Sequence, residues 1–213
     1  MNKNIYFIFF LISIVFSQAP IPKRPDGHKQ GDINAPVYLE MFCDLLCPDC
    51  AHSWPTIKNV LEYYGSSKIY FIFHVFPLPY HTSAFFMAEA SLVLENYTQS
   101  LFWDLLDSLY IDSKQQMFWD DAVENTTLEG IKSLMGSYLL DEFGLPNSYF
   151  WNGMNDVTID WNSRVSWKYA CTRGVSGTPT FMVNGVYVAM GSDSSLNDWI
   201  NLLNPLFLNK PIY

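Results

Sequence analysis

Basic residues are scarce in this sequence, which holds 12 Lys and Arg against 21 Asp and Glu and has a formal net charge of −9 at pH 7. Lys and Arg form no run, so the positive footprint typical of nucleic-acid-binding domains and of surfaces for anionic lipids is missing. We therefore expect no nucleic acid among the partners. The acidic balance mainly favours solubility.

Long apolar segments are also nearly missing. Ile5–Phe16 ("IYFIFFLISIVF") is almost wholly apolar, but it is shorter than the ~20 residues that a helix needs to cross a bilayer. Lys3 precedes it and small or polar residues follow from Ser17, which is the layout of a secretory signal peptide. We predict a signal peptide over residues 1–17 and no stable membrane insertion after its cleavage. The expected location is the secretory pathway, in the endoplasmic reticulum lumen or outside the cell, or the periplasm of a bacterium.

Cysteine is used sparingly, with four residues in the chain, yet three of them lie within "FCDLLCPDC", residues 42–50. In an oxidising secretory compartment cysteines tend to be paired or redox-active, and four cysteines fit two pairs. Asn96 and Asn125 each begin an Asn-X-Thr sequon, a candidate glycosylation site in a eukaryotic secretory pathway.

The crowded cysteines can be interpreted in two ways. The outer spacing of Cys43, Cys47 and Cys50, C-x3-C-x2-C, resembles the cluster-binding cysteines of radical-SAM enzymes and could also suit a soft metal. The inner C-x2-C resembles the redox dithiol of thioredoxin-like proteins. A radical-SAM enzyme needs a larger barrel of repeated strand–helix units, and the histidines form no ligand pattern with the cysteines. We therefore predict neither a metal nor another cofactor.

The order of predicted elements indicates an α/β protein. A strand–helix–strand unit implies a parallel pair of strands with a right-handed crossover, and Asn-Gly between two apolar runs predicts a tight hairpin. This order resembles a thioredoxin fold (βαβ, then a β-hairpin and a C-terminal helix) with a helical insertion. We predict a thioredoxin-like domain from residues 35–81 and 147–208 and an inserted helical subdomain at 82–146. The underlying elements are an extended segment at 18–34, strands at 36–42 and 68–76, a helix from Pro48 to Gly65, helices within 82–145 and near 152–172, a hairpin around Asn184-Gly185, and a helix near 194–203.

Cys47 lies where a reactive thiol would be expected. A thiol attacks a disulfide as the thiolate, and the unpaired N–H groups and dipole at a helix N-terminus stabilise negative charge. Pro48 suits the first helical position, where no backbone donor is needed. Cys47 is thus the predicted attacking thiol and Cys50, one turn further, the resolving thiol. A purely structural disulfide between them is the alternative.

Two acidic residues flank the predicted nucleophile. The charge of Asp49, between the cysteines, should offset much of the helix effect and leave Cys47 less acidic than a His at that position would. Asp44, three residues before Cys47, is a candidate proton acceptor, although a turn-forming role after the strand explains it equally well.

A second motif lies far downstream, in "GVSGTPTFMVNG" at residues 174–185. Together with Cys-Pro-Asp-Cys at the first helix and the helical insertion, it resembles the DsbA-type thiol–disulfide oxidoreductases over roughly residues 35–205. The resemblance implies a cis bond between Thr178 and Pro179, packed against the dithiol. It also implies that the Thr178 backbone binds substrate peptide as an added strand.

The sequence departs from that family in two places. A buried carboxylate often found before the dithiol has no clear counterpart, because Glu40 is one residue out of register and so should face the other side of the strand. Cys43 and Cys171 are additional cysteines. In a thioredoxin fold their neighbourhoods can approach each other, so a Cys43–Cys171 structural disulfide is our expectation, with free thiols or a second redox couple as alternatives.

These features predict a protein disulfide oxidoreductase of the secretory pathway. Its partners would be protein or peptide thiols and disulfides, together with a membrane-bound or soluble redox partner. The alternatives are a non-catalytic thioredoxin-fold binding or chaperone-like protein and a glutathione-using transferase on a related fold. The direction of disulfide exchange does not follow from the sequence, because small electrostatic differences between the two redox forms determine it.

Overall fold

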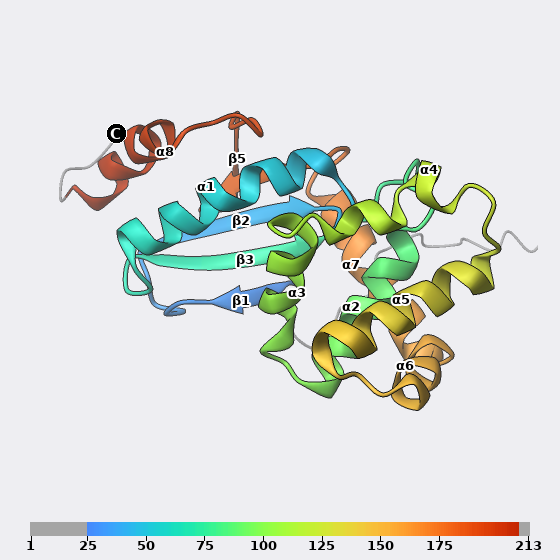
Figure 1. Cartoon of the computed structure of the whole chain (residues 1–213). Helices are drawn as coiled ribbons and strands as arrows, with labels where there is room; N and C mark the ends of the chain where they lie inside the picture. Colours follow the sequence, from blue (N-terminus) through green and yellow to red (C-terminus); the bar gives the residue numbers. More distant parts are fainter. Residues whose placement is uncertain (1–24, 209–213) are drawn as a thin grey trace, which may run out of the picture.

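The computed structural model describes residues 25–208, and the predicted signal peptide lies outside them. Five strands form one sheet in the order β1-β3-β2-β4-β5 (Figure 1). The strands are β1 (His28–Gln30), β2 (Val37–Cys43), β3 (Ile69–Val75), β4 (Thr180–Val183) and β5 (Val186–Val188). The helices are α1 (Pro48–Tyr64), α2 (Ala84–Tyr97), α3 (Leu101–Tyr110), α4 (Asp120–Val123), α5 (Leu128–Phe143), α6 (Asn147–Met154), α7 (Val157–Thr172) and α8 (Leu196–Leu203), with 3-10 turns η1 (Lys114–Phe118) and η2 (Asn204–Phe207).

The pairing of the strands confirms the predicted α/β class and its thioredoxin-type order. β2 and β3 are parallel, and the other three pairs are antiparallel. Asn184 and Gly185 connect β4 to β5 with φ values of 49° and 79°, and positive φ at both positions is what a two-residue hairpin turn of this kind requires. Thr180 pairs with Phe42, so the segment just before β4 lies beside the end of β2.

One face of the sheet is covered by α1, α3 and α8. Trp54 of α1 packs edge-on against Phe73 of β3, with ring centroids 6.1 Å apart. Trp199 of α8 packs in the same way against Phe181 of β4, at 5.0 Å. Because side chains alternate along a strand, every second residue of β2 also points to this face. These residues are Val37, Leu39, Met41 and Cys43, all of them buried.

The opposite face of the sheet packs against α7. Phe42 of β2 stacks on the His74 ring of β3, with centroids 4.3 Å apart, and Tyr169 of α7 lies 5.4 Å from the same imidazole. The Ser166 hydroxyl of α7 also donates a hydrogen bond to the backbone carbonyl of Val75, at 3.3 Å. The two faces are therefore separated by the sheet and carry different sets of side chains.

Helices α2, α5 and α6 form a block beyond the C-terminal ends of β2 and β3, with α3 and α7 connecting it to the sheet (Figure 1). Gly153 of α6 approaches Val93 of α2 so closely that a Cβ at position 153 would lie 2.6 Å from the valine side chain. Trp103 of α3 stacks on Trp54 of α1 at 6.3 Å. The C-terminal ends of β2 and β3 consequently meet the helical block, and the cysteine-rich segment lies at this junction.

Two elements differ from the sequence-based prediction. Residues 28–30, within the segment predicted to be extended, form the edge strand β1. The helix predicted near 152–172 is divided into α6 and α7, because Asp156 caps α7 by accepting a hydrogen bond from the backbone N–H of Thr158 at 2.8 Å. A capping Asp satisfies backbone donors that a continuous helix would pair internally.

Across residues 25–208, no helix combines the length and the apolar character needed to cross a membrane. Asn96 and Asn125 are both exposed, so their side chains are accessible for modification, and glycosylation itself remains a prediction.

Candidate active site

Cys47 and Cys50 lie at the N-terminus of α1, directly after β2. Cys47 is the N-cap residue, with extended backbone angles (φ −73°, ψ 123°), and Pro48 begins the helix. Pro at this position has no N–H to leave unpaired. The Cys47 residue is 4% exposed and Cys50 is 0% exposed. Cys47 is thus the outer thiol of the pair and Cys50 the inner one.

The Thr178–Pro179 segment lies against this dithiol. Its peptide bond is cis, as the family resemblance implied. The Cys47 thiol donates a hydrogen bond to the Thr178 carbonyl, with 3.6 Å between sulfur and oxygen. The Thr178 hydroxyl is buried with no hydrogen-bond partner in the described part of the chain, and it lowers the pKa of both Cys47 and Cys50. It is therefore placed to stabilise a thiolate on either one.

The thiol pair favours its neutral form. Contact with Cys50 raises the pKa of the Cys47 thiol and burial raises it further, whereas the Thr178 hydroxyl and the Cys50 backbone N–H lower it. Burial also raises the pKa of Cys50 well above its usual range. Because each thiol affects the pKa of the other, they titrate as a pair. The sequence predicted that the charge of Asp49 would offset much of the effect of the helix N-terminus on the Cys47 pKa. The leading causes of the raised pKa are instead the interaction with Cys50 and burial, and Asp49 is exposed to solvent.

Asp44 is fully buried and connects two loops next to the dithiol. Its Oδ1 accepts a hydrogen bond from the backbone N–H of Leu46 at 2.8 Å, and its Oδ2 accepts one from the N–H of Leu78 at 2.7 Å. Oδ2 also lies 2.9 Å from Nδ1 of His81. These contacts favour the turn-forming interpretation of Asp44, because both carboxylate oxygens are occupied by partners other than the sulfurs.

Sequence analysis missed His81 and Tyr110. The hydrogen bond to Asp44 raises the pKa of His81, and the sulfur of Cys47 is close enough to contribute to that increase. The Tyr110 hydroxyl donates to the backbone carbonyl of Asp44 at 2.9 Å. Burial raises the pKa of Tyr110 well above its usual range, and the nearby sulfurs of Cys50 and Cys43 add to that increase. Neither residue carries a sequence signal, because both come from the segments after β3 and enter the site only through folding.

The structure does not contain the predicted Cys43–Cys171 disulfide. The described residues include all four cysteines, and each is an unpaired thiol. Cys43 is 0% exposed and points to the face of the sheet that α1 covers, where its thiol interacts with that of Cys50. Cys171 lies on α7, which packs against the other face, and its side chain is exposed. The sheet itself therefore separates the two sulfurs.

Glu40 points away from the dithiol, as its register predicted, and joins a buried charge cluster under α7. Its carboxylate oxygens lie 3.2 Å from the Arg173 guanidinium and 3.4 Å from Nε2 of His74, and Nδ1 of His74 lies 2.7 Å from Asp26. Burial lowers the pKa of His74, but the two carboxylates outweigh burial and raise it overall. Burial raises the pKa of Glu40 and of Asp26, and their cationic partners reverse this and lower both values.

No metal-binding geometry is found within residues 25–208, where no group of three or more His, Cys, Asp or Glu side chains could hold an ion. This applies to Cys43, Cys47 and Cys50 as well, although their three sulfurs lie close together.

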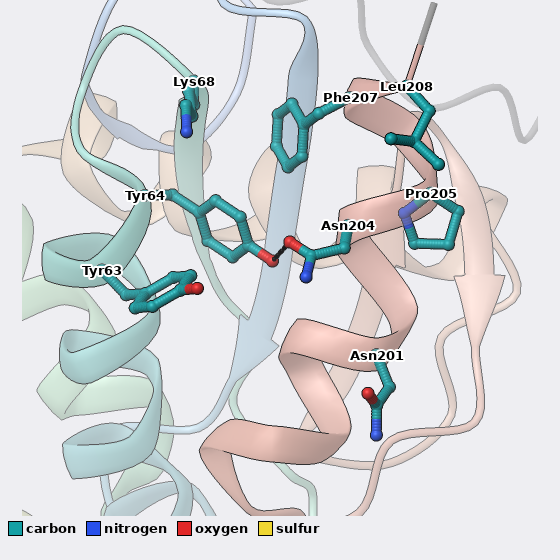
Figure 2. A pocket seen from close by; sticks show the side chains of 8 residues that line it. All are labelled: Tyr63, Tyr64, Lys68, Asn201, Asn204, Pro205, Phe207 and Leu208. Carbon is teal, nitrogen blue, oxygen red and sulfur yellow. Dashed lines mark hydrogen bonds between the residues drawn. The ribbon is translucent and has the colours of Figure 1, made fainter. Parts of the chain in front are cut away.

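A surface pocket of about 550 Å³ lies far from the dithiol, at the C-terminal end of α1 (Figure 2). There the Tyr64 hydroxyl donates to the side-chain oxygen of Asn204 at 2.9 Å, and Lys68 lies 5.7 Å from the centroid of the Phe207 ring. A helix of 17 residues spans about 25 Å at 1.5 Å per residue, so this pocket contributes nothing to the chemistry at Cys47. Its contacts hold η2 against α1.

Several solved structures share this fold. A candidate protein-disulfide isomerase from Pseudomonas syringae superposes with a TM-score of 0.69 at 16% identity, over 84% of this chain and 98% of that one. The α-DsbA1 protein of Wolbachia pipientis gives a TM-score of 0.65 at 19% identity, over 88% and 92% of the two chains. DsbA from Pseudomonas aeruginosa gives 0.55 at 18% identity, over 88% and 86%. At these identities the similarity concerns the fold.

Sequence comparisons match this chain to a curated protein and to a family model. The chain is 27% identical over 170 residues to a protein named Na(+)/H(+) antiporter NhaA 3 from Salinispora tropica, and it spans only 23% of that protein's length while 78% of this chain is aligned. The family model described as thioredoxin matches residues 23–202, from the segment before β1 into α8. With the strand order, the Cys47–Cys50 pair at the start of α1 and the cis-proline segment facing it, this match shows that the chain belongs to the thioredoxin family.

Proposed function

We propose that this chain is a thiol–disulfide oxidoreductase that exchanges disulfides with protein substrates through Cys47 and Cys50. The observation that carries the proposal is the position of the Cys47 sulfur, at the N-terminus of α1 and 3.6 Å from the Thr178 carbonyl, with the buried Cys50 in the first turn of the same helix. The similarity in fold to proteins named DsbA and protein-disulfide isomerase supports it.

In the oxidising direction, a substrate thiolate attacks the Cys47 sulfur of the Cys47–Cys50 disulfide. The bond between the two cysteines breaks, a mixed disulfide forms at Cys47, and Cys50 leaves as a thiolate that takes up a proton. A second substrate thiolate then attacks the substrate sulfur of the mixed disulfide, which releases the substrate disulfide and the reduced dithiol. In the reducing direction the same steps run backwards, with Cys47 attacking and Cys50 resolving.

The residues around the dithiol would each contribute to this exchange. The backbone at Thr178 would pair with the substrate peptide as an added strand, and its hydroxyl would stabilise the departing thiolate. Pro48 begins α1 without a donor of its own, and the backbone N–H of Cys50 in the first turn lowers the pKa of Cys47. The protonated His81, held by Asp44, would add positive charge on the side of the helical block.

The proposed location is a secretory or other extracytoplasmic compartment, where such a dithiol can be kept oxidised. The predicted signal peptide over residues 1–17 and the exposed sequons at Asn96 and Asn125 support it. N-terminal sequencing of the protein isolated from its native cells should begin at or near residue 18. A mature chain that still begins with Met1 would argue against this location.

The test of the activity is oxidation of a dithiol peptide by the purified, oxidised protein, followed as the rate of disulfide formation. Cys47→Ser is expected to reduce the rate at least 100-fold, whereas the exposed Cys171→Ser should retain the parental rate. A Cys47→Ser protein that catalyses the exchange as well as the parent would reject the proposal.

One observation favours a second function. Cys47 is only 4% exposed, so a thioredoxin-fold binding protein with an inert Cys47–Cys50 disulfide is the alternative. The redox potential separates the two, because structural disulfides have potentials below about −300 mV. A potential above that range, together with rapid exchange with glutathione, is expected for the oxidoreductase.

A further inference from the structure

Cys43 and Cys50 share a buried environment on the face of the sheet that α1 covers. Cys43 is the last residue of β2 and Cys50 lies in the first turn of α1, and both are 0% exposed. Both belong to one cluster of buried core residues, and their thiols are near enough to affect each other's pKa. Since the register of β2 fixes the direction of the Cys43 side chain, this proximity is a property of the fold.

Cys50 is the central sulfur of a row of three. Its thiol lies near enough to the thiols of both Cys43 and Cys47 to affect their pKa values. Cys47 raises the pKa of Cys43 through its charge alone, a smaller influence than that of Cys50. This order matters for chemistry, because in thiol–disulfide exchange the attacked sulfur lies between the attacking sulfur and the leaving sulfur.

We propose that Cys43 is a third redox residue, which attacks the Cys50 sulfur of the Cys47–Cys50 disulfide. The bond between Cys47 and Cys50 breaks, a bond between Cys43 and Cys50 forms, and Cys47 leaves as the thiolate. The proton that Cys43 gives up is transferred to Cys47 or to solvent. The chain stays oxidised by two electrons throughout, so the step needs no external oxidant or reductant.

This inference rests on the proposed function, since it requires a Cys47–Cys50 disulfide that takes part in exchange. It adds a second oxidised form of the same site. In the first form, Cys47 is part of the disulfide and accepts attack from a substrate thiol. In the second, the disulfide is buried between Cys43 and Cys50, and Cys47 is free to attack a substrate disulfide. A single chain would then both oxidise thiols and rearrange disulfides.

The relative amount of the two forms follows from burial. Burial raises the pKa of the Cys43 thiol, so Cys43 is a poorer attacking group than a solvent-exposed cysteine. Cys47, at the helix mouth, is a better leaving group than a thiol within the core, because helix N–H groups stabilise its charge. The inner disulfide is therefore expected as a minor form in the parent and as the main form when Cys47 is removed.

The test uses the full chain and identifies which sulfurs are linked. Asp-N protease cleaves before Asp44 and before Asp49, so it separates Cys43, Cys47 and Cys50 into peptides 32–43, 44–48 and 49–103. The parent and Cys47→Ser are equilibrated with oxidised glutathione, free thiols are blocked with N-ethylmaleimide in acid, and the digest is analysed by mass spectrometry without reduction.

We expect peptide 32–43 linked to peptide 49–103 in most Cys47→Ser chains and in a measurable minority of parent chains. Cys47→Ser/Cys171→Ser, the matched control, should keep the linkage, and Cys47→Ser/Cys43→Ser should lose it. Absence of the linked peptide from either the parent or Cys47→Ser overturns the proposal, because the step requires that both disulfides form in one chain.

Failure of this inference can be distinguished from failure of the proposed function. The rate at which the parent oxidises a dithiol peptide, compared with that of Cys47→Ser, tests the function without reference to Cys43. A parent that needs Cys47 for exchange but never links Cys43 to Cys50 would leave the oxidoreductase intact and remove only the third redox residue.

Discussion

The Asp44 carboxylate and the His81 imidazole form a pair at 2.9 Å beside the Cys47 thiol. Asp44 comes from the end of β2 and His81 from the loop between β3 and α2, so the pair joins the cysteine segment to the entrance of the helical block. Because the hydrogen bond to Asp44 raises the pKa of His81, the imidazole carries more positive charge near neutral pH than a free histidine does. We expect this pair to influence the charge state of the dithiol.

Replacing His81 should make Cys47 less acidic. His81→Gln removes a positive charge near the sulfur, and we expect the thiolate fraction at a given pH near neutrality to fall about two- to fivefold, a modest change because solvent screens a partly exposed pair. Thiolate absorbance at 240 nm, titrated against pH, measures it. His52→Gln, at an exposed position of α1, is the matched control and should leave the titration unchanged. An equal thiolate pKa in His81→Gln and the parent would show that this pair has no electrostatic role.

The Thr178 hydroxyl should stabilise the thiolate. It lowers the pKa of Cys47 and of Cys50, and Thr178→Val keeps the shape of the side chain while it removes the donor. We expect the thiolate titration to move to higher pH and the redox potential to become more negative, because the reduced form loses its stabilisation. Thr158→Val, on the exposed start of α7, should change neither quantity. A lower thiolate pKa in Thr178→Val would contradict the assigned role.

Asp49→His should lower the thiolate pKa of Cys47, since it replaces a negative charge by a group that carries positive charge below its own pKa. Asp49 is exposed, and burial and thiol contact dominate at Cys47, so we expect a two- to tenfold increase in thiolate fraction near pH 6. Glu62→His, near the other end of α1, makes the same exchange of charge far from the sulfur and is the control. No decrease in the pKa, or an increase, refutes the prediction.

The buried cluster under α7 predicts a dependence of stability on pH. The folded-state pKa of His74 is raised above 6.5. Its contribution to the stability of the fold is therefore fully present below pH 6.5 and is lost as the pH rises through the raised pKa. The pKa values of Asp26 and Glu40 are lowered from 3.8 and 4.5. Their contributions are present above those values and are lost as the pH falls through the lowered ones. The cluster should therefore stabilise the fold most between about pH 4.5 and pH 6.5.

His74→Gln tests this window. Removing one partner from a buried group of charges costs about 3 kcal/mol, and we expect a loss of that size in the free energy of unfolding at pH 5.5, measured by urea denaturation. The difference from the parent should shrink as the pH rises through the raised pKa of His74, because the imidazole is then neutral in both states. His52→Gln should unfold like the parent at each pH. A loss that stays constant from pH 5 to pH 9 would mean that His74 contributes by packing alone.

Residue patterns and local backbone preferences in the sequence were sufficient to predict the main elements of the architecture. Apolar runs rich in β-branched and aromatic residues predicted β2 and β3, Asn184-Gly185 predicted the hairpin, and Cys47-Pro48 predicted the start of α1. These signals are local, because each depends on backbone preferences within a few residues. The division of the helix near 152–172 was not recognised, since a helical pattern continues across Asp156 and only the capping bond ends it.

The sequence by itself determined which residues begin and end the main elements, and through strand register it also placed Glu40 on the face away from the dithiol. Only the tertiary structure decided which helix covers each face, and with that the partners of Cys43, His81 and Tyr110. A pairing of Cys43 with Cys171 was consistent with the chain order. It failed because α7 packs on the face opposite Cys43, and the packing of helices on a sheet depends on contacts between residues distant in sequence, which no local pattern specifies.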